Sequence, residues 1–433
     1  MQKIVLLVTL LVIQHAFSQK QEFDIVFKNV NIVSMENDKP LLNQNIAIKN
    51  GKIIAIENAK KSKLKAIKTI DLKGKYIMPS LADAHIHLPE KEEDLKRFFE
   101  LNILHGVTKL RSMRGDWKHL AWKEKYNSKD SQFPKLYLSA PPISRSLEAT
   151  PEELESFVKK SKESGFKFLK ILSIKNQDVF VQLDNLSKKY DIPLAGHFPY
   201  LSAGVSIDEE LFLKSNFNSL EHLGGLIGDP KFFESRLQAI KKNNIFICPT
   251  LTWYSIGSGQ YSYDELQKLA GMEYVSIATM QTWLEKTKQY RDKMGEQALK
   301  EEVAKELNDL EEKYKVINRL QKEGIKMLLS PDASSKYMMV GSNIISEIEL
   351  LKKANLSNFE ILEMATTNFA QFFNENYGVL KTGNDADFIV LDENPIDNLQ
   401  TLKNVKGLYF NSFYLSSENL MELKASLLSS SNK

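Results

Sequence analysis

The chain has 433 residues, of which 42% are hydrophobic and 26% are charged, a composition typical of globular proteins and not of disordered ones. Its 58 basic and 55 acidic residues give a formal net charge of +3 and are well mixed along the sequence. We therefore expect a large core in one or two domains, and we exclude nucleic acid and anionic lipid surfaces as partners.

The first eighteen residues have the pattern of an export signal. Lys3 precedes an apolar run from Ile4 to Ile13, and Ala16 and Ser18 form a small-residue cleavage pattern. This order is typical of a secretory signal peptide, so we predict a signal over residues 1–18 and a periplasmic or secreted protein. The run is too short for an ordinary membrane span, and we expect none in the mature protein; an uncleaved anchor is the alternative.

Both ends of the mature chain have the pattern of β-structure. Residues 23–79 contain segments rich in Ile and Val, separated by Asn-Gly and Lys-Gly turns that are typical of hairpins. Residues 377–395 and 405–415 indicate three more strands with Gly and Asn turns. We predict that residues 19–76 and 376–433 together form one small β-sandwich domain.

The middle of the chain, residues 77–375, alternates between short apolar runs and polar segments of helical period. Eight such β/α alternations predict an α/β fold, a (β/α)8 TIM-like barrel. A helical insertion, about 255–323, interrupts the repeat between Leu251 and Ile325. Two interpretations of this insertion stay open: a lid over the site, or helices of the outer shell.

Six polar residues lie in or directly after predicted strands. In a parallel barrel the carboxyl ends of the strands converge on one mouth, so these side chains are expected to meet. Two of them, in the segment "DAHIHL", are two positions apart and would share one face of a strand. The six are His85, His87, Lys170, His197, His222 and Asp332.

These residue types indicate a metal site. Neutral imidazole and carboxylate are ordinary ligands for a divalent ion such as zinc, and four histidines with Asp332 would hold two ions if a bridging anion were supplied. Lys170 lies among apolar residues, where burial favours its neutral amine, and such an amine can react with carbon dioxide to form a carbamate. We predict two divalent ions, with zinc as the expected metal, bridged by this carbamate. Ion pairing of Lys170 with an acidic neighbour is the alternative.

Several segments along the chain resemble the amidohydrolase superfamily, specifically its imidazolonepropionase-like or prolidase-like branch of metal-dependent hydrolases. They are "PSLADAHIHL", "HGVTKLRSMRG", "FLKILS", "AGHFPY", "SLEHLGG", "LLSPDAS" and "GVLKTGNDADFIVLDENP". The resemblance implies one metal bound by His85, His87, carboxylated Lys170 and Asp332, and a second bound by Lys170, His197 and His222.

Two segments depart from the pattern of that superfamily. Ser330 and Pro331 stand in "SPDA", where a "GTDA"-like run is usual, and Asn343 stands where related sequences often carry a histidine. Neither departure removes a predicted ligand. We expect the first to change the surroundings of Asp332 and the second to change contacts with substrate.

The predicted reaction is hydrolysis of an amide bond of a small substrate, such as a dipeptide, an N-acyl amino acid or a cyclic amide. A hydroxide between the two ions would attack the carbonyl, with Asp332 and carboxylated Lys170 as the catalytic residues and Asp332 passing the proton to the leaving amine. Arg111 and Arg114, placed in the loop after the second strand, are candidates to bind a substrate carboxylate, with surface ion pairing as the alternative. Tyr200 is a candidate for contact with the carbonyl oxygen.

Other functions stay open at this stage. A lactonase or esterase would use the same dinuclear site, and a non-catalytic secreted binding protein would keep only the scaffold. A mononuclear ring deaminase would usually place a Glu shortly after the histidine of the fifth strand, and "HFPYLSAG" has none. The sequence is compatible with a homo-oligomer.

Overall fold

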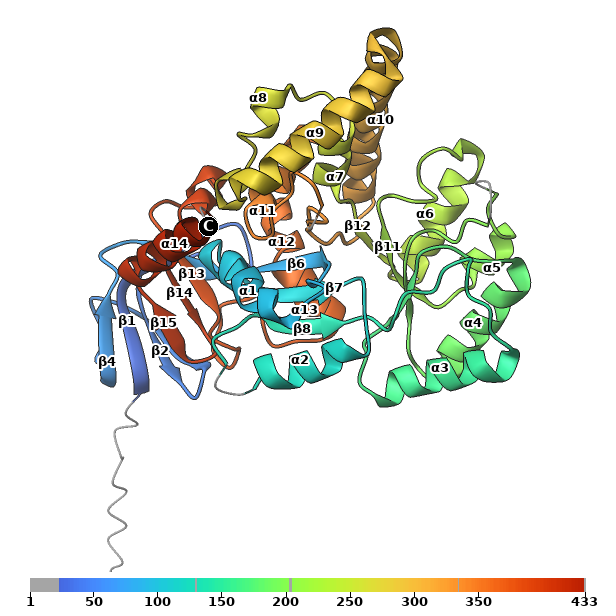
Figure 1. Cartoon of the computed structure of the whole chain (residues 1–433). Coiled ribbons are helices and arrows are strands. Elements are labelled where there is room, and N and C mark those ends of the chain that lie inside the picture. The colour runs from blue at the N-terminus through green and yellow to red at the C-terminus, as the bar shows by residue number, and fades with distance from the viewer. Residues whose placement is uncertain (1–22, 129–130, 202–204, 334, 432–433) are drawn as a thin grey trace, which may run out of the picture.

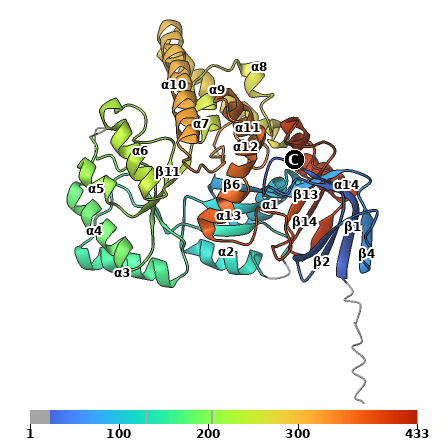
Figure 2. The ribbon, with the colours of Figure 1, turned by 180° about the vertical axis from the view of Figure 1, so that it is seen from behind.

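The computed structural model describes residues 23–128, 131–201, 205–333 and 335–431 (Figure 1). The signal peptide predicted for residues 1–18 lies outside the described residues. The described part of the chain is an α/β structure with one large mixed sheet at one end and two parallel sheets beside it, surrounded by helices (Figures 1 and 2).

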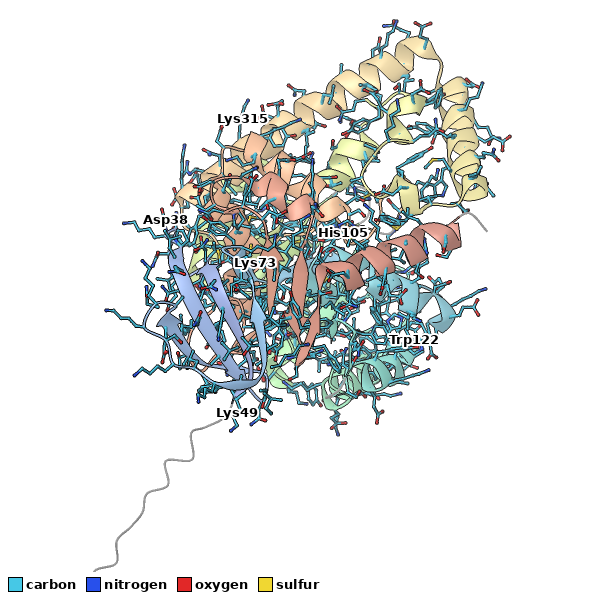
Figure 3. All side chains as sticks on the ribbon, turned by 90° about the vertical axis from the view of Figure 1, so that its left-hand side faces the viewer. Asp38, Lys49, Lys73, His105, Trp122 and Lys315 are labelled. Carbon is cyan, nitrogen blue, oxygen red and sulfur yellow. The ribbon has the colours of Figure 1, made fainter. Side chains whose placement is uncertain are left out.

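The large sheet has eight strands that come from both ends of the chain, and Figure 3 turns it toward the viewer. Their order is β15-β14-β13-β5-β1-β2-β3, with β4 paired to β1. Phe388 lies opposite Pro79 where the two chain ends pair, and the ring of Phe388 packs 5.1 Å from that of Phe27. The strands are β1 (Phe23–Ile32), β2 (Leu41–Lys49), β3 (Lys52–Asn58), β4 (Ala66–Asp71), β5 (Tyr76–Pro79), β13 (Phe388–Leu391), β14 (Gly407–Phe410) and β15 (Phe413–Leu415).

Two parallel sheets follow, and nearly all of their residues are buried, as expected for parallel strands covered on both faces. The sheet of order β6-β7-β8 contains β6 (Leu81–Ile86), β7 (Val107–Ser112) and β8 (Lys135–Leu138). The sheet of order β12-β11-β10-β9 contains β9 (Leu169–Ile171), β10 (Leu194–Gly196), β11 (Phe217–Glu221) and β12 (Phe246–Cys248).

Isolated contacts join these two sheets at both edges. Residues after β8 pair with the start of the next sheet through the bridge from Ser139 to Phe168. On the other side, Ile247 bridges Met327, and the amide of Ala84 donates a hydrogen bond of 3.0 Å to the carbonyl of Leu329. Parallel pairing thus runs from β6 to β12 and returns to β6 through residues 327–329. The closed eight-stranded barrel stays a prediction, as does the β-sandwich, because the strands form three separate sheets.

Helices follow most of the parallel strands, and α3 shows how local sequence starts one. Thr150 accepts a hydrogen bond from the amide of Glu153, whose side chain in turn accepts one from the amide of Thr150, and Pro151 occupies the first turn. The helices outside the insertion are α1 (Leu95–Leu104), α2 (Lys118–Tyr126), α3 (Pro151–Glu163), α4 (Gln177–Lys189), α5 (Glu209–Leu213), α6 (Phe233–Lys242), α7 (Leu251–Gly257), α11 (Asn343–Lys353), α12 (Asn358–Met364), α13 (Thr367–Phe373) and α14 (Ser417–Ser431).

The segment predicted as an insertion contains three further helices, α8 (Tyr263–Leu266), α9 (Ile277–Met294) and α10 (Glu296–Lys322). Figure 1 shows them together above α7, on the side where β11 and β12 lie. Leu266, Met272 and Tyr337 form a hydrophobic cluster of their own there, separate from the main core. No helix among the described residues combines the length and the apolar character that a membrane span needs.

Three local expectations differ from the structure. The apolar run expected as the first barrel strand is two strands, β5 in the large sheet and β6 in a parallel sheet, and the Ser80 hydroxyl between them bonds to Asp387. The expected eighth strand, residues 325–332, has only the bridge at Met327 and single hydrogen bonds such as that from Ala84 to Leu329. Its pairing ends before Pro331, which lacks an amide hydrogen, and Asp332, whose backbone is left-handed with φ of 58°. The C-terminal segment ends in α14, which packs against α1, rather than in β-structure.

Candidate metal centre

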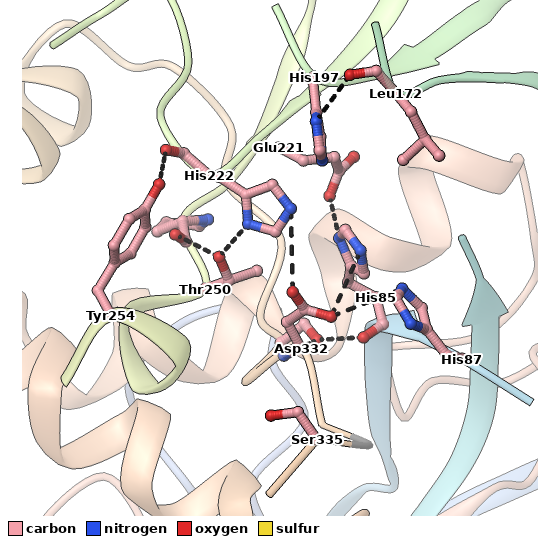
Figure 4. A network of polar contacts seen from close by, with 12 residues as sticks. His85, His87, Leu172, His197, Glu221, His222, Thr250, Tyr254, Asp332 and Ser335 are labelled. Carbon is pink, nitrogen blue, oxygen red and sulfur yellow. Dashed lines mark hydrogen bonds and ion pairs between the residues drawn. The ribbon is translucent and has the colours of Figure 1, made fainter. Parts of the chain in front are cut away.

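The six residues predicted to bind metal line a single cavity of about 400 Å³. Figure 4 shows the histidines and Asp332 of this group. His85 lies in β6 with His87 directly after that strand, and Lys170 lies in β9. The other three follow the carboxyl end of β10, the carboxyl end of β11 and the segment 327–329; they are His197, His222 and Asp332. The structure thus brings all six together, with Lys170 inside its strand and Asp332 after the bridge at Met327 rather than after a strand.

Three of the imidazoles are oriented by a hydrogen bond at Nδ1. His85 Nδ1 lies 2.8 Å from Glu221 Oε2, and His197 Nδ1 lies 3.0 Å from the carbonyl oxygen of Leu172. Because these oxygens accept, each Nδ1 carries the proton and Nε2 keeps its lone pair. This is the tautomer that binds a metal through Nε2, so the donor set fits a metal centre.

The third oriented imidazole is that of His222. Its Nδ1 lies 2.7 Å from Thr250 Oγ1, and the Thr250 hydroxyl itself donates to the carbonyl of Pro249 at 2.8 Å. The hydroxyl proton is therefore used elsewhere, and Thr250 accepts from His222 Nδ1. His222 Nε2 is left with its lone pair toward the cavity, like the Nε2 atoms of His85 and His197.

The carboxylate of Asp332 faces the histidines at distances that suit a shared ion. Its Oδ1 lies 3.6 Å from His85 Nε2 and 3.7 Å from His87 Nε2, while its Oδ2 lies 3.9 Å from His222 Nε2. Two ligand atoms of a tetrahedral zinc ion are about 3.4 Å apart. These separations are longer than hydrogen bonds, and they match a group of atoms arranged around a cation.

Lys170 is buried to 1% exposure, and its Nζ has no hydrogen-bond partner among the residues that the structure describes. The pKa of the Lys170 amine is lowered to about 8, chiefly by burial, with Glu221 opposing the shift and the Arg111 guanidinium adding to it. The chain is also fitted closely around this side chain, because a Cβ at Gly196 would lie 2.9 Å from Lys170 Cδ. An orphaned, easily neutralised amine is what a carbamate requires.

Burial also keeps the histidines in the form that binds metals. It lowers the pKa of His87 and of His197 to about 4, and it lowers the pKa of His85 and His222 well below the usual 6.5. The positive charge of Lys170 acts in the same direction on all four. At neutral pH the imidazoles are therefore uncharged and available as ligands.

Asp332 has the opposite shift. Burial raises the pKa of its carboxyl to about 8, and Lys170 opposes this shift by lowering it. A cation in the cavity would favour the ionised form and lower that pKa. The carboxyl therefore keeps its proton near neutral pH only while no cation lies in the cavity.

Three residues of the centre have left-handed backbones although none is glycine. They are His222, Thr250 and Asp332, with φ of 61°, 54° and 58°. This conformation costs a β-branched or bulky residue free energy, and the surrounding structure must hold it. Such residues gather at functional sites, and here His222 and Asp332 line the cavity while Thr250 orients His222.

Sequence reasoning missed the buried residues that support the centre. Glu221 has no exposed surface, bonds His85 through Oε2 and receives Arg111 Nη1 at 3.0 Å through Oε1. The Ser219 hydroxyl donates to the same Oε1 at 2.9 Å and lies 2.5 Å from Arg111 Nη2. The signal was the acidic residue at the end of a predicted strand, directly before His222, since a charge buried there needs a partner.

The expected role of Arg111 requires correction. We placed it in the loop after the second strand as a ligand for a substrate carboxylate, whereas it lies inside β7 with no exposed surface. Its guanidinium packs 4.5 Å from the centroid of the Phe168 ring and is bound to Glu221 and to the carbonyl of Ala84. Arg111 therefore supports Glu221 and does not reach the cavity.

The other substrate candidates are placed differently. Arg114 is exposed, with Nη2 3.9 Å from Glu90 Oε1, and its charge lowers the pKa of His87. Tyr200 lines the cavity, and its hydroxyl accepts a hydrogen bond of 3.2 Å from the amide of Gly225. Trp253 and Tyr254 also line the cavity.

The two departures from the pattern affect only the surroundings. Ser330 accepts from the amide of Asp332 at 3.1 Å and lies 2.5 Å from Asp83 Oδ1, so it links the loop of Asp332 to β6. Asn343 is buried at the start of α11, where it bonds Ser346 at 3.2 Å, and it is not among the residues that line the cavity.

An α/β fold with histidines and a carboxylate gathered at the ends of parallel strands defines a class of metal-dependent hydrolases. The model of the amidohydrolase family matches residues 76–412, and the chain belongs to this family. It is 26% identical to an adenine deaminase of Clostridium perfringens over 248 residues, which are 52% of this chain and 40% of the deaminase. The chain thus matches less than half of the length of that curated relative.

Two solved structures share the fold. A bottromycin amidohydrolase has a TM-score of 0.73 at 18% identity, with 94% of this chain and 90% of the other covered. A Xaa-Pro dipeptidase with bound methionine in its active site has a TM-score of 0.66 at 16% identity, with 90% and 99% covered. The likeness extends over nearly the whole chain in both.

Proposed function

We propose that this chain is a dinuclear metal-dependent amidohydrolase that cleaves an amide bond of a small substrate, such as a dipeptide, an N-acyl amino acid or a cyclic amide. One observation carries the proposal: in His85, His197 and His222 the Nδ1 atom makes a hydrogen bond, so each Nε2 atom is free to bind a metal ion. These imidazoles surround the Lys170 amine, which has no hydrogen-bond partner among the described residues. Family membership and the fold of a Xaa-Pro dipeptidase add support.

The donor set would hold two divalent ions, and zinc is the metal we expect. His85, His87 and Asp332 would bind one ion, His197 and His222 the other, with carboxylated Lys170 shared between them. When bound, such ions supply a water activated near neutral pH and a Lewis acid for the scissile carbonyl.

The carbamate would form on Lys170 before any turnover. Its neutral amine would attack carbon dioxide: a nitrogen–carbon bond forms as one carbon–oxygen π bond opens, and one N–H proton is released, so that the nitrogen carries a carboxylate. Lys170 is 1% exposed, so this group would lie away from bulk water. Glu221 is held by Arg111 and does not compete for the amine.

Asp332 is the residue proposed to move the proton. In its ionised form it receives the proton of the attacking water, and in its neutral form it delivers that proton to the leaving amine. Its carboxylate lies 3.6 Å from His85 Nε2 and 3.9 Å from His222 Nε2, next to proposed ligands of both ions. Trp253 and Tyr254 form a largely apolar wall that limits water around the reacting bond.

We also propose export and a closed scaffold. The pattern of residues 1–18 supports a periplasmic or secreted enzyme. The hydrogen bond from Ala84 to Leu329 and the bridge from Ile247 to Met327 support a (β/α)8 barrel, with a β-sandwich made by the two chain ends.

Deamination of a ring amine is a second candidate, and the match to an adenine deaminase favours it. The acidic residues that line the cavity are Glu221 and Asp332. Glu221 is bound on both oxygens, so Asp332 alone would have to serve as acid and base. Ammonia release from adenine by the zinc-loaded protein tests this candidate directly.

A screen of the zinc-loaded protein against dipeptides, N-acyl amino acids, lactones and nucleobases tests the proposed function. Hydrolysis of an amide that is lost in Asp332→Asn is the expected result. Turnover of adenine or of lactones alone, with every amide left intact, would overturn the proposal.

A further inference from the structure

A second cavity of about 270 Å³ adjoins the metal-binding cavity, and Trp253 lines both. The indole is 45% exposed, which is high for so large an aromatic side chain, and its ring centroid lies 6.2 Å from that of His222. Trp253 therefore forms a shared wall, with the metal ligands on one side and the second cavity on the other.

The helical insertion and the loop after Asp332 build this second cavity. Leu266 comes from α8, Tyr290 from α9 and Leu299 from α10, while Tyr337 follows the last metal ligand by five residues. The strands that carry the metal ligands contribute no residue to its lining. The insertion therefore does not serve only as helices of the outer shell, because it adds a cavity next to the candidate metal centre.

Hydrogen bonds between the elements fix the walls. Thr287 Oγ1 lies 2.8 Å from the Tyr337 hydroxyl, which ties α9 to the loop after Asp332. The Tyr290 hydroxyl donates to Glu302 at 2.9 Å and ties α9 to α10. Arg291 Nη2 donates to the carbonyl of Tyr261 at 2.7 Å. A cavity with walls held in this way is formed before any ligand arrives.

The lining is chiefly apolar and aromatic, with a positive edge. Ile256, Leu299 and Met338 supply aliphatic surface beside the aromatic rings. The charged residues of the lining are Arg291, Lys336 and Glu302, and Glu302 is bound by Tyr290. Such a lining favours a large apolar or aromatic group that is neutral or anionic, and it disfavours a cationic one.

We propose that this second cavity is a substrate subsite, which holds a large apolar or aromatic arm of an amide whose scissile bond lies beside the metal ligands. The inference rests on the proposed amide hydrolysis and narrows its substrate class, from any small amide to one with an extended apolar arm. Trp253 would pack against the arm where it passes from one cavity to the other.

Leu299 offers a direct test, since its Cδ1 lies 3.9 Å from the position of a Cβ on Gly259 and thus faces across the cavity. Leu299→Trp fills the cavity, and Leu299→Ala enlarges it. Ala304→Trp, on the exposed face of the same helix, is the matched control. Melting temperatures of the three variants identify any that fail to fold.

The first readout is hydrolysis of N-acetylalanine and N-(4-phenylbutanoyl)alanine by the zinc-loaded proteins. Each buried methylene raises kcat/KM up to about fourfold, so the parent should prefer the long arm by at least about tenfold. Leu299→Trp should abolish this preference and leave the acetyl substrate within about twofold, while Ala304→Trp keeps it. An equal preference in the parent and in Leu299→Trp overturns the subsite.

The second readout does not depend on turnover. Binding of 4-phenylbutyrate, measured by calorimetry, should weaken at least about tenfold in Leu299→Trp and stay unchanged in Ala304→Trp, and 4-phenylbutylamine should bind the parent more weakly than the anion. Unchanged phenylbutyrate binding in Leu299→Trp overturns the subsite even if amides are hydrolysed. If phenylbutyrate binding weakens in Leu299→Trp as expected but neither amide is hydrolysed, the subsite is supported and the proposed amide hydrolysis is contradicted.

Discussion

Arg111 and Glu221 form a fully buried ion pair behind the candidate metal centre, with Arg111 Nη1 3.0 Å from Glu221 Oε1. The other oxygen of Glu221 holds His85 Nδ1 at 2.8 Å. The guanidinium thus fixes the carboxylate, and the carboxylate fixes both the tautomer and the orientation of a metal ligand. This buried ion pair therefore lies where it fixes the orientation of a proposed metal ligand.

Replacement of Glu221 should weaken metal binding. Glu221→Gln removes the charged acceptor of His85 Nδ1, and loss of such a partner typically lowers metal affinity about 10- to 100-fold. Glu375→Gln, which removes a carboxylate from a surface pair with Lys135, is the control. Competition with a chelator measures both affinities. Equal affinities in the two variants would show that Glu221 serves only stability.

Replacement of Thr250 should also weaken metal binding, because Thr250 orients His222. Thr250→Val removes the oxygen that accepts from His222 Nδ1, so we expect a fall of about 10-fold or more in metal affinity. Thr250→Ser keeps the hydroxyl and should stay within about threefold of the parent. If Ser and Val lower the affinity alike, the hydroxyl is not what orients His222.

Replacement of Arg111 and replacement of Arg114 should change the unfolding free energy by different amounts. Arg111→Met leaves the carboxylate of Glu221 buried without its cation, and breaking such a pair costs about 3–5 kcal/mol of unfolding free energy. Arg114→Met, at an exposed position 3.9 Å from Glu90, should cost less than about 0.5 kcal/mol. Urea unfolding of both variants measures this. Similar losses would contradict the buried placement of Arg111.

The six metal-binding candidates could be predicted because parallel strands end on one side, so residues after strand ends meet wherever the strands pair. Arg111 and Glu221 could not be paired in this way. They are 110 residues apart and lie on β7 and β11, strands of two different sheets, so their contact depends on which side chains face each other across the interior. A single sequence shows that each charge needs a partner but not which one.

The limits of the large-scale prediction have a similar cause. The alternation of apolar runs located seven of the eight expected strands, but residues 325–332 form no strand, because Pro331 and the left-handed Asp332 interrupt the pairing. The C-terminal helix α14 was missed because its buried residues, Leu420 and Leu427, find their partner only when α1 is packed beside them.

His105 gives a prediction of pH dependence outside the metal centre. His105 is labelled in Figure 3 and directly follows α1. Burial lowers the pKa of its imidazole to about 4, and its Nε2 lies 2.9 Å from Ser342 Oγ. Between pH 6.5 and pH 4 the unfolded chain binds a proton that the folded chain does not. The unfolding free energy should therefore be unaffected by His105 above pH 6.5 and fall by about 1–3 kcal/mol toward pH 4.

His105→Gln isolates this contribution, since all other titrating groups are common to both proteins and cancel in the comparison. Denaturant unfolding at several pH values should show the parent losing stability relative to the variant as the pH falls from 6.5 to 4. Curves that stay parallel over this range would contradict the assignment.

Lys170 tests the dinuclear centre most sharply. Lys170→Ala removes the carboxylate that would be shared between the ions, and it leaves one ion with mainly His197 and His222. Acetate or propionate can occupy the vacated volume as a small carboxylate and should restore part of the turnover. An amine that serves only as a buried cation predicts no such rescue.

The most direct measurement of the central claim is the number of metal ions bound per chain, determined by elemental analysis of the parent and of Lys170→Ala purified side by side. The account predicts close to two divalent ions in the parent, and fewer ions with lower turnover in the variant. Two ions and normal turnover in Lys170→Ala, or a fully active parent with a single ion, would contradict it.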